Sequence, residues 1–178
     1  MSTEVPSAAE ASEGLHEQVW PEWVYPYPAG IIGGLLGAAA VALVGIGYCL
    51  ITPTVGIWLP VNVVAATLLR DLQAQSTQVL SQFNFLALVV GLAIHVTISI
   101  GLGEVFSFIL PALPGRPLYW GPVIGPLLWV GATFAVLPIL NPRMAADVEW
   151  VSFGLANVLY GLILGWWIDR TPLVHVER

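Results

Sequence analysis

Charged residues are scarce in this sequence, and lysine is absent altogether. Of 178 residues, 9% are charged and 57% are hydrophobic, against about 25% and about 45–50% in an average soluble domain. Such a chain cannot cover a water-facing surface, so the composition predicts a membrane protein, and the mean hydropathy of +0.84 agrees. Five Arg against 11 acidic residues give a net charge of −6, which excludes the basic surface of a nucleic-acid binder.

Cysteine is nearly absent as well. The single residue, Cys49, lies inside an apolar run, which excludes a disulfide framework and a cysteine-based zinc or iron–sulfur site within this chain. The sequence also has no nucleophile elbow, no glycine-rich phosphate loop and no HExxH motif. We therefore expect that the chain is not an enzyme.

Four long runs carry almost no charge, at residues 29–51, 85–110, 119–140 and 151–168. At 1.5 Å per residue, each spans or nearly spans a hydrocarbon core of about 30 Å. Because lipid offers no hydrogen-bond partners to a backbone, such runs must be helical. The sequence predicts an all-α integral membrane fold, a bundle of four transmembrane helices within a domain of residues 27–178.

Tryptophan positions support these boundaries independently. Seven of the eight Trp residues lie near a predicted helix end, and only Trp129 lies in the middle of a span. Membrane proteins concentrate Trp and Tyr in this way at the two membrane–water interfaces. The aromatic residues and the hydropathy therefore indicate the same four spans.

A fifth apolar stretch, between the first two spans, is too short to cross the membrane. Over residues 61–73 the apolar positions 61, 64, 65, 68 and 72 share one helical face, with Asn62, Arg70 and Gln73 away from it. This pattern predicts a short amphipathic helix at the membrane interface.

The first 26 residues form a separate segment, acidic at first and then rich in Trp and Pro. This segment contains glutamates but no Arg or Lys. It therefore lacks the basic region with which a secretory signal begins. Composition alone favours a solvated, disordered tail. We predict instead that the tail lies along a neighbouring subunit, held through its glutamates and through Trp20 and Trp23, because anionic headgroups repel it.

Four spans place both ends of the chain and the proline-rich second loop on one side of the membrane. That side carries Arg116, Arg170 and Arg178, and the other carries Arg70 and Arg143. Because cytoplasmic loops are enriched in positive charge, this bias favours termini in the cytoplasm.

Two ionisable residues lie within the spans, where such groups suggest function. His95, near the middle of the second span, is a weak candidate for a haem or metal ligand or a proton relay. The structural alternative, which we favour, is a neutral ring that shares hydrogen bonds with Thr97, Ser99 or a neighbouring helix. Glu104 lies nine residues later on the opposite face, and we expect it to approach the headgroups.

Glycine recurs at a spacing of four residues, which lets helix backbones approach closely. The pairs are Gly30 with Gly34, Gly33 with Gly37, Gly121 with Gly125, and Gly161 with Gly165. We expect these faces to serve both packing inside the bundle and docking onto another membrane subunit, because two or three such faces exceed what one small bundle requires.

Several short motifs resemble those of small, mostly uncharacterised four-span bacterial membrane proteins associated with respiratory-chain gene neighbourhoods, including those of haem–copper oxidases. The motifs are GIWLPVN at residues 56–62, a histidine in the second span, and NP followed by W-x-x-F before the last span. The corresponding residues are Gly56, Trp58, Pro60, Asn62, His95, Asn141, Pro142, Trp150 and Phe153. The resemblance covers roughly residues 29–168 and implies membership of an electron-transfer assembly in a bacterial inner membrane, without supplying catalytic residues.

We therefore expect a non-catalytic accessory subunit of a respiratory or photosynthetic membrane complex. It would brace subunits that carry haem, copper or pigment, bind lipid or a quinone, and hold no redox cofactor of its own. The alternative is a small homo-oligomeric transporter or channel, with His95 near the midplane and Asn157 and Tyr160 as companions along the path.

Overall fold

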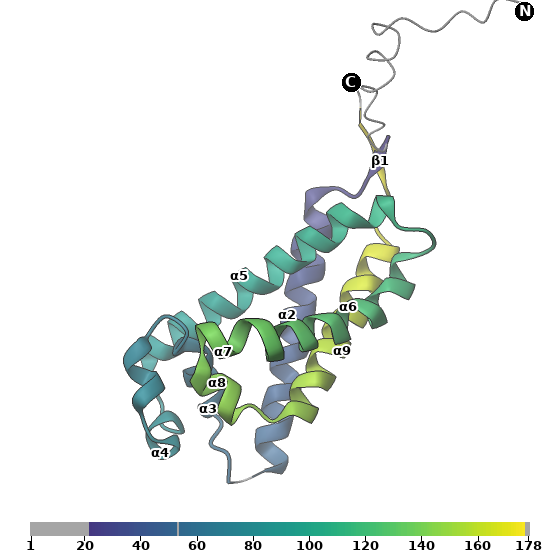
Figure 1. Cartoon of the computed structure of the whole chain (residues 1–178). Helices are drawn as coiled ribbons and strands as arrows, with labels where there is room; N and C mark the ends of the chain where they lie inside the picture. The colour runs from purple at the N-terminus through teal and green to yellow at the C-terminus, as the bar shows by residue number, and fades with distance from the viewer. Residues whose placement is uncertain (1–21, 53, 177–178) are drawn as a thin grey trace, which may run out of the picture.

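The computed structural model describes residues 22–52 and 54–176, and four of its helical segments are long and apolar enough to cross a membrane (Figure 1). The predicted all-α fold with four spans is confirmed, and the chain is a multi-pass membrane protein. The spans are α2 (Tyr27–Ile51), α5 (Phe85–Ile109) continued by the 3₁₀ turn η2 (Leu110–Ala112), a third segment over Pro117–Leu140, and α9 (Trp150–Asp169).

The first and third spans each begin two residues earlier than the hydropathy predicts. Pro28 and Pro117 lie in the opening turns of their helices. At that place a proline is favourable, because its missing N–H would have no partner within the helix and its φ is already helical.

The third span is not one continuous α-helix. It consists of α6 (Pro117–Gly131), a π-helical turn η3 (Ala132–Val136) and α7 (Leu137–Leu140). Pro138 has no N–H with which to continue the α-helical pattern, and wide turns of this kind accommodate such a break. The length of this span follows from its apolar run, whereas the change from α-helical to π-helical hydrogen bonding follows from Pro138.

The spans pack in the order α5, α2, α9, α6, so that α2 and α9 are central and α5 and α6 are flanking (Figure 1). In the most apolar stretches of α2 and α9, 39% and 33% of residues are buried, against 17% in α5 and in the third span. The two flanking spans therefore turn most of their surface outward.

Glycines set the distance between α2 and α5. A Cβ added at Gly30 would lie 2.8 Å from the carbonyl oxygen of Gly103, and one at Gly34 would collide with the carbonyl oxygen of Ser99. Because backbone atoms cannot move aside as a flexible side chain can, only glycine fits at these two positions.

The other glycine pair of the first span faces α9. A Cβ at Gly33 would lie 2.7 Å from Cδ1 of Leu164, and one at Gly37 would lie 2.5 Å from Cδ2 of Tyr160. All four candidate docking glycines of α2 are therefore in contact within the chain, and the structure places them in the bundle interior rather than on a surface for another subunit.

The pair α6 and α9 repeats the arrangement. Gly121 and Gly161 approach each other's carbonyl oxygens, Gly125 lies against the backbone at Asn157, and a Cβ at Gly165 would lie 2.9 Å from the carbonyl oxygen of Pro117. The three main helix contacts of the bundle thus all use close backbone approach.

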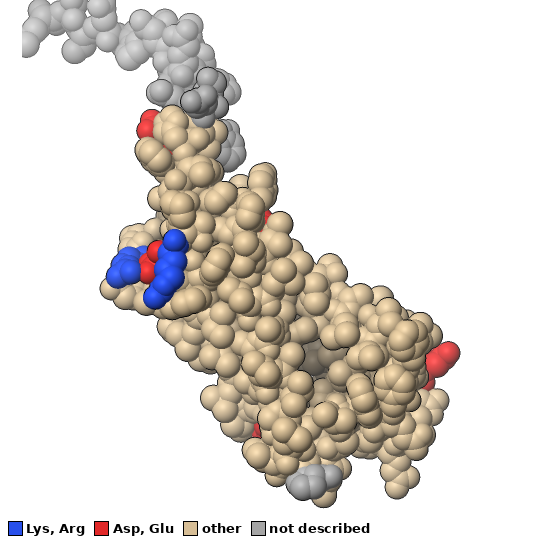
Figure 2. Space-filling view, turned by 180° about the vertical axis from the view of Figure 1, so that it is seen from behind, with Lys and Arg blue, Asp and Glu red and all other residues tan. Residues whose placement is uncertain are grey.

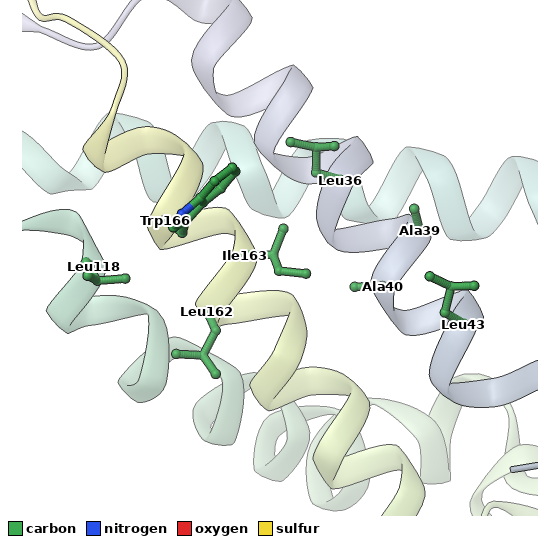
Figure 3. A pocket seen from close by; sticks show the side chains of 8 residues that line it. All are labelled: Leu36, Ala39, Ala40, Leu43, Leu118, Leu162, Ile163 and Trp166. Atoms are coloured by element: carbon green, nitrogen blue, oxygen red, sulfur yellow. The ribbon is translucent and has the colours of Figure 1, made fainter. Parts of the chain in front are cut away.

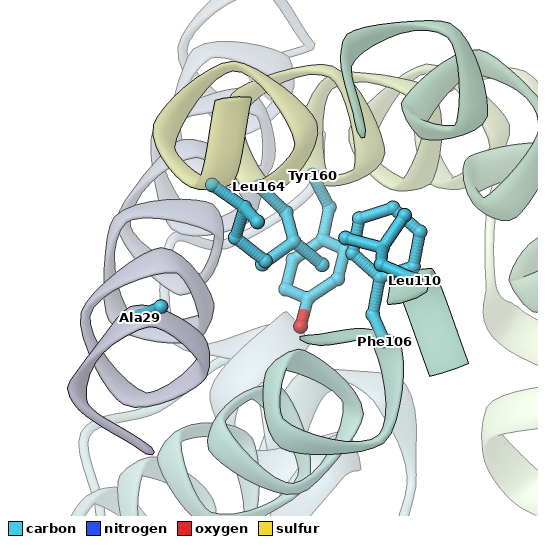
Figure 4. Close-up of a cluster of buried hydrophobic side chains, with 6 residues drawn as sticks. Ala29, Phe106, Leu110, Tyr160 and Leu164 are labelled. Carbon is cyan, nitrogen blue, oxygen red and sulfur yellow. The ribbon is translucent and has the colours of Figure 1, made fainter. Parts of the chain in front are cut away.

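A compact apolar cluster fills the space between α2, α5 and α9 (Figure 4). Its buried members are Ala29, Phe106, Leu110, Tyr160, Leu164 and Ile168. Tyr160 crosses this cluster from α9, and its hydroxyl donates a 2.6 Å hydrogen bond to the carbonyl oxygen of Ser99 on α5. Its polar tip is therefore satisfied at full burial, as a buried tyrosine requires.

Short helices cover the end of the bundle opposite the chain termini. They are α3 (Leu59–Ala65), the 3₁₀ helix η1 (Arg70–Ala74), α4 (Thr77–Leu80) and α8 (Pro142–Asp147). A short helix between the first two spans is confirmed, but the predicted segment 61–73 is divided into α3 and η1. The side-chain amide of Gln73 donates to the carbonyl oxygen of Ala66 at 2.8 Å and so satisfies a group that the break leaves open.

The buried face of α3 differs from the predicted one. Asn62, expected away from the apolar face, is 2% exposed and belongs to the buried face of α3, whereas Leu68, expected on the apolar face, lies beyond the end of this helix. Hydropathy could not show this because the amide of Asn62 is buried together with its acceptors, the carbonyl oxygens of Leu80 and Gln82.

A two-stranded antiparallel ribbon joins the two ends of the described chain, and the sequence analysis did not predict it. It pairs β1 (Trp23–Val24) with β2 (Val174–His175), with Trp23 opposite His175. The rings of these two residues meet edge to face with centroids 5.1 Å apart. The ribbon holds both ends of the described chain on one side of the bundle, as four spans require.

Replacing Gly34 by Leu is expected to separate α2 from α5, because the new side chain would collide with backbone atoms of Ser99 and Ile100. Overpacking of this kind typically costs about 1–3 kcal/mol. We expect Gly34→Leu to lower the midpoint of thermal unfolding in detergent by several degrees while leaving membrane insertion intact.

Gly45→Leu is the matched control, since a Cβ at Gly45 meets nothing within 4 Å. Equal unfolding midpoints for the two variants would contradict the assignment of the Gly34 face to packing within the chain.

Candidate functional site

Most of the motif residues named in the sequence analysis meet at the capped end of the bundle. Trp58 and Pro60 open α3, Asn141 and Pro142 open α8, and the two short helices contact each other. Beneath them lies a small apolar cluster of Leu59, Val63 and Leu80, against which Val55, Leu72 and Met144 pack. Segments almost 80 residues apart in the sequence thus form one structure, which we call the asparagine clamp.

Asn141 is the centre of the asparagine clamp and is fully buried. Its side-chain amide donates to the carbonyl oxygen of Val63 at 2.7 Å and to the hydroxyl of Thr67 at 2.9 Å. Its side-chain oxygen accepts from the backbone N–H of Met144 at 2.9 Å and so caps α8. One side chain therefore begins a helix and ties it to α3.

Asn62 makes the equivalent connection on the other side of α3. Its amide donates to the carbonyl oxygens of Leu80 at 2.6 Å and Gln82 at 2.8 Å. These two residues lie at the end of α4 and just after it, before the second span begins. Asn62 thus fixes the approach of the chain to α5.

The remaining motif residues have structural contacts of their own. Pro60 and Pro142 occupy the opening turns of α3 and α8, where proline is favoured. The ring of Trp58 meets that of Phe83 with centroids 4.9 Å apart, and the ring of Trp150 meets that of Phe153 at 6.5 Å. The first pair joins the start of α3 to the segment that leads into α5, whereas the second lies within the opening turn of α9.

Glu149 caps the N-terminus of α9. Its carboxylate accepts from the backbone N–H groups of Val151 and Ser152 at 3.0 and 2.6 Å. Hydrogen bonds from Ser152 and then Val151 lower the pKa of this carboxyl below its usual value. The charged form is therefore favoured at the positive end of the helix dipole.

Two arginines lie at the rim of the asparagine clamp. Arg70 donates to the carbonyl oxygen of Leu140 at 2.7 Å. Arg143 pairs with Asp147 at 2.6 Å and donates to the hydroxyl of Thr77 at 2.8 Å. Both side chains join short helices to their neighbours.

His95 is half-buried between α5 and α2. Its Nε2–H donates to the carbonyl oxygen of Ala38 at 3.0 Å, and because a carbonyl oxygen can only accept, that nitrogen carries the proton. This is the hydrogen bond to a neighbouring helix that the structural interpretation expects. Among residues 22–52 and 54–176, no group of three or more His, Cys, Asp or Glu side chains is placed to hold a metal ion.

Glu104 lies on the side of α5 that faces the opening turn of α2. Its Cα would lie 2.8 Å from a Cβ at Gly30. One of its carboxylate oxygens, Oε1, is buried and has no hydrogen-bond partner in the described part of the chain. The structure does not bring Glu104 and His95 into one site.

The proposed companions of His95 do not form a path with it either. Asn157 donates to the carbonyl oxygen of Phe153 on its own helix at 2.8 Å, and Tyr160 donates across to Ser99. Of the two Trp residues assigned to a partner contact, Trp23 lies in β1, whereas Trp20 lies outside the described residues, together with Glu4, Glu10, Glu13 and Glu17.

The end of the bundle that carries the termini holds a charged group that sequence reasoning missed. The guanidinium of Arg116 forms a two-point hydrogen bond with Asp169, at 3.1 and 2.5 Å. This bond, and then the charge of Asp169, raises the pKa of Arg116 above its usual value. The sequence did contain a signal for this ion pair. With four spans, the loop that carries Arg116 lies on the same side of the membrane as the end of α9, where Asp169 offers the opposite charge.

Arg170 lies next to this pair and stacks on Trp166, with its guanidinium carbon 4.3 Å from the ring centroid. Figure 2 shows basic side chains gathered around acidic atoms at one end of a face that is otherwise largely uncharged. In the described part of the chain, Arg170 forms no ion pair with a carboxylate, because Asp169 is occupied by Arg116.

Beside Trp166 an apolar groove of about 560 Å³ runs along α2 and α9 (Figure 3). Trp166 lies at one end of the groove and Leu43 at the other. Its lining consists of Leu36, Ala39, Ala40, Leu43, Leu118, Leu162, Ile163 and Trp166. A site of this size and lining can hold a hydrocarbon chain, and it offers no group for acid–base or nucleophilic chemistry.

Replacing Asn141 by Ala is expected to loosen the asparagine clamp, because the buried carbonyl oxygen of Val63 loses its donor. Leaving such a group unsatisfied costs about 1–3 kcal/mol. We expect a lower unfolding midpoint and faster amide hydrogen exchange in α3 as well as α8.

Asn84→Ala is the control for Asn141→Ala. Asn84 also caps a helix, accepting from the N–H of Ala87 at 3.1 Å, but it is exposed and contacts no second element in this way. If both variants lose the same stability and α3 exchange is unchanged, Asn141 is only a helix cap.

Replacing His95 by Gln is expected to leave folding and assembly intact, since the Gln amide can still donate to the carbonyl oxygen of Ala38. Any haem spectrum of the purified assembly should be unchanged. Loss of a haem or metal absorbance band from an otherwise intact assembly would instead identify His95 as a ligand.

No protein-family model, curated protein or solved structure matches this chain. Its function is therefore inferred from the two ends of the bundle and from the surfaces of its spans.

Proposed function

We propose that this chain is a non-catalytic accessory subunit of a larger membrane complex, in which it braces subunits that carry the reactive groups. The observation that supports this most directly is the uneven coverage of the spans. Only 17% of the most apolar stretch is buried in α5 and in the third span. Leu92 and Leu127, which are 49% and 61% exposed, are typical of the large side chains on these flanking helices. A neighbouring membrane subunit can pack against them.

The use of polar groups inside the bundle favours an accessory role over transport by a homo-oligomer. A path for ions or polar solutes needs ionisable or hydrogen-bonding groups that remain accessible along its length. Here His95, Asn157 and Tyr160 each donate to a backbone carbonyl of the same chain. These hydrogen bonds stabilise the fold and leave no connected polar route among the described residues.

The resemblance of the motif residues supports a more specific assignment. We infer an electron-transfer complex, respiratory or photosynthetic, in a bacterial inner membrane, with haem, copper or pigment on the partner subunits. The arginine bias favours the terminal side of the bundle as the cytoplasmic one. In this assignment the rigid bundle positions its neighbours, and the acidic tail is a further contact with them.

Purification from native membranes in a mild detergent tests this function. We expect tagged chain to co-migrate with larger integral membrane proteins that carry a visible absorbance band, and mass spectrometry identifies them. A defined homo-oligomer, or the chain alone, would contradict the proposal.

A bulky substitution on a flanking span sharpens the experiment. If α6 is a docking surface, Leu127→Trp should reduce the amount of recovered partner about tenfold, which corresponds to about 1.4 kcal/mol. Leu92→Trp is the corresponding test for α5. Leu50→Trp, at a 70% exposed position near the end of α2, is the control. Unchanged recovery for both flanking variants would leave α5 and α6 facing lipid.

A further inference from the structure

The apolar groove and the charged group beside it form one amphipathic site. The groove lies along α2 and α9, and Trp166 closes it at the end from which the chain termini leave (Figure 3). Arg170 stacks on that same Trp166, and Arg116 lies two residues before Leu118, another lining residue. We propose that this site binds an anionic phospholipid, with one acyl chain in the groove and the phosphate on Arg170.

The size and lining of the groove support an acyl chain. Its volume of about 560 Å³ lies within the range of small-molecule sites, and all eight of its lining residues are apolar. Along α2 the lining extends from Leu36 to Leu43, which corresponds to about 10 Å of helix. Ala39 and Ala40 lie within this stretch and keep the groove open between larger side chains.

The charge at the mouth of the groove supports an anionic headgroup. Both carboxylate oxygens of Asp169 accept from Arg116, so the charge of Arg170 is not neutralised by its neighbour. Guanidinium groups bind phosphate oxygens with strong, charge-assisted hydrogen bonds. Among residues 22–52 and 54–176, Arg170 donates only to the carbonyl oxygen of Trp166, at 3.3 Å, which leaves its other N–H groups for a ligand.

The depth of the two parts matches the layers of a phospholipid. Trp166 and Trp167 lie in the last turn of α9, at the level where aromatic residues meet the headgroups. The groove continues from there toward the middle of α2, where the membrane is hydrocarbon. A ligand that fills both parts must be polar and anionic at one end and apolar along the rest.

Native mass spectrometry of the full-length chain tests the site. The protein is exchanged from detergent into nanodiscs of phosphatidylglycerol or phosphatidylcholine with identical acyl chains, and retained lipid is counted after release. We expect one phosphatidylglycerol to be retained in preference to phosphatidylcholine. Arg170→Gln should reduce phosphatidylglycerol retention about tenfold without changing that of phosphatidylcholine.

Ala39→Phe tests the groove independently, because its ring would occupy the space of the acyl chain. It should reduce retention of both lipids, with an unfolding midpoint like that of the parent chain, since Ala39 is exposed. Ala39→Leu replaces it if the larger ring unfolds the protein. The matched controls are Arg70→Gln, at the opposite end, and Ala93→Phe, at an exposed position of α5.

Retention of phosphatidylglycerol by Arg170→Gln equal to that of the parent would overturn the headgroup assignment. A lipid-free dimer that Ala39→Phe dissociates would show that a second copy occupies the groove, and would overturn the proposal. This inference develops the expectation, drawn from the sequence, that the accessory subunit also binds lipid. Because lipid is measured on the isolated chain, its failure is distinguishable from a failure to co-purify partner subunits.

Discussion

Direct contact between helix backbones is the constraint on which the rest of this molecule depends. Gly34 lies against the backbone of Ser99, and Gly121 and Gly161 lie against each other, so that no side chain separates these helices. In lipid, where water exclusion does not drive helices together, close packing of this kind is a main source of association. The hydrogen bonds of His95 and Tyr160 to backbone carbonyls become possible only at this short distance.

The two ends of the bundle join neighbouring segments through different kinds of polar group. At one end buried amides of Asn62 and Asn141 satisfy carbonyl oxygens that short helices leave open. At the other end the ion pair of Arg116 and Asp169 joins the second loop to the last span. Amides remain neutral when buried, whereas the charges keep contact with the headgroup layer, and this difference is what lets Arg170 serve as a ligand-binding group.

The number and position of the spans could be predicted because a long uncharged run can cross lipid only as a helix. The pairing of the glycine faces could not, since Gly30 and Gly33 have the same local pattern but contact different helices. Asn62 shows a second limit: hydropathy assigns a polar residue to the exposed face, and its burial depends on acceptors 18 and 20 residues away. The motif residues could be singled out from the sequence, but nothing in their spacing indicates that Asn141 bonds to α3. The lipid groove depends on three helices and on Trp166, and a one-dimensional pattern does not reveal it.

The terminal ribbon brings the first and the last span, which are farthest apart in the sequence, to one place in the fold. The amide of Val176 donates to the carbonyl oxygen of Glu22 at 2.9 Å, so the described chain closes into a ring in which α2 and α9 are adjacent. During synthesis, however, α2 emerges first and α9 last. The α9-facing side of α2, with Gly33 and Gly37, therefore has no partner until the whole membrane domain has been made. For that interval another protein or a lipid must cover it, and the bundle closes only when the last span displaces that temporary neighbour.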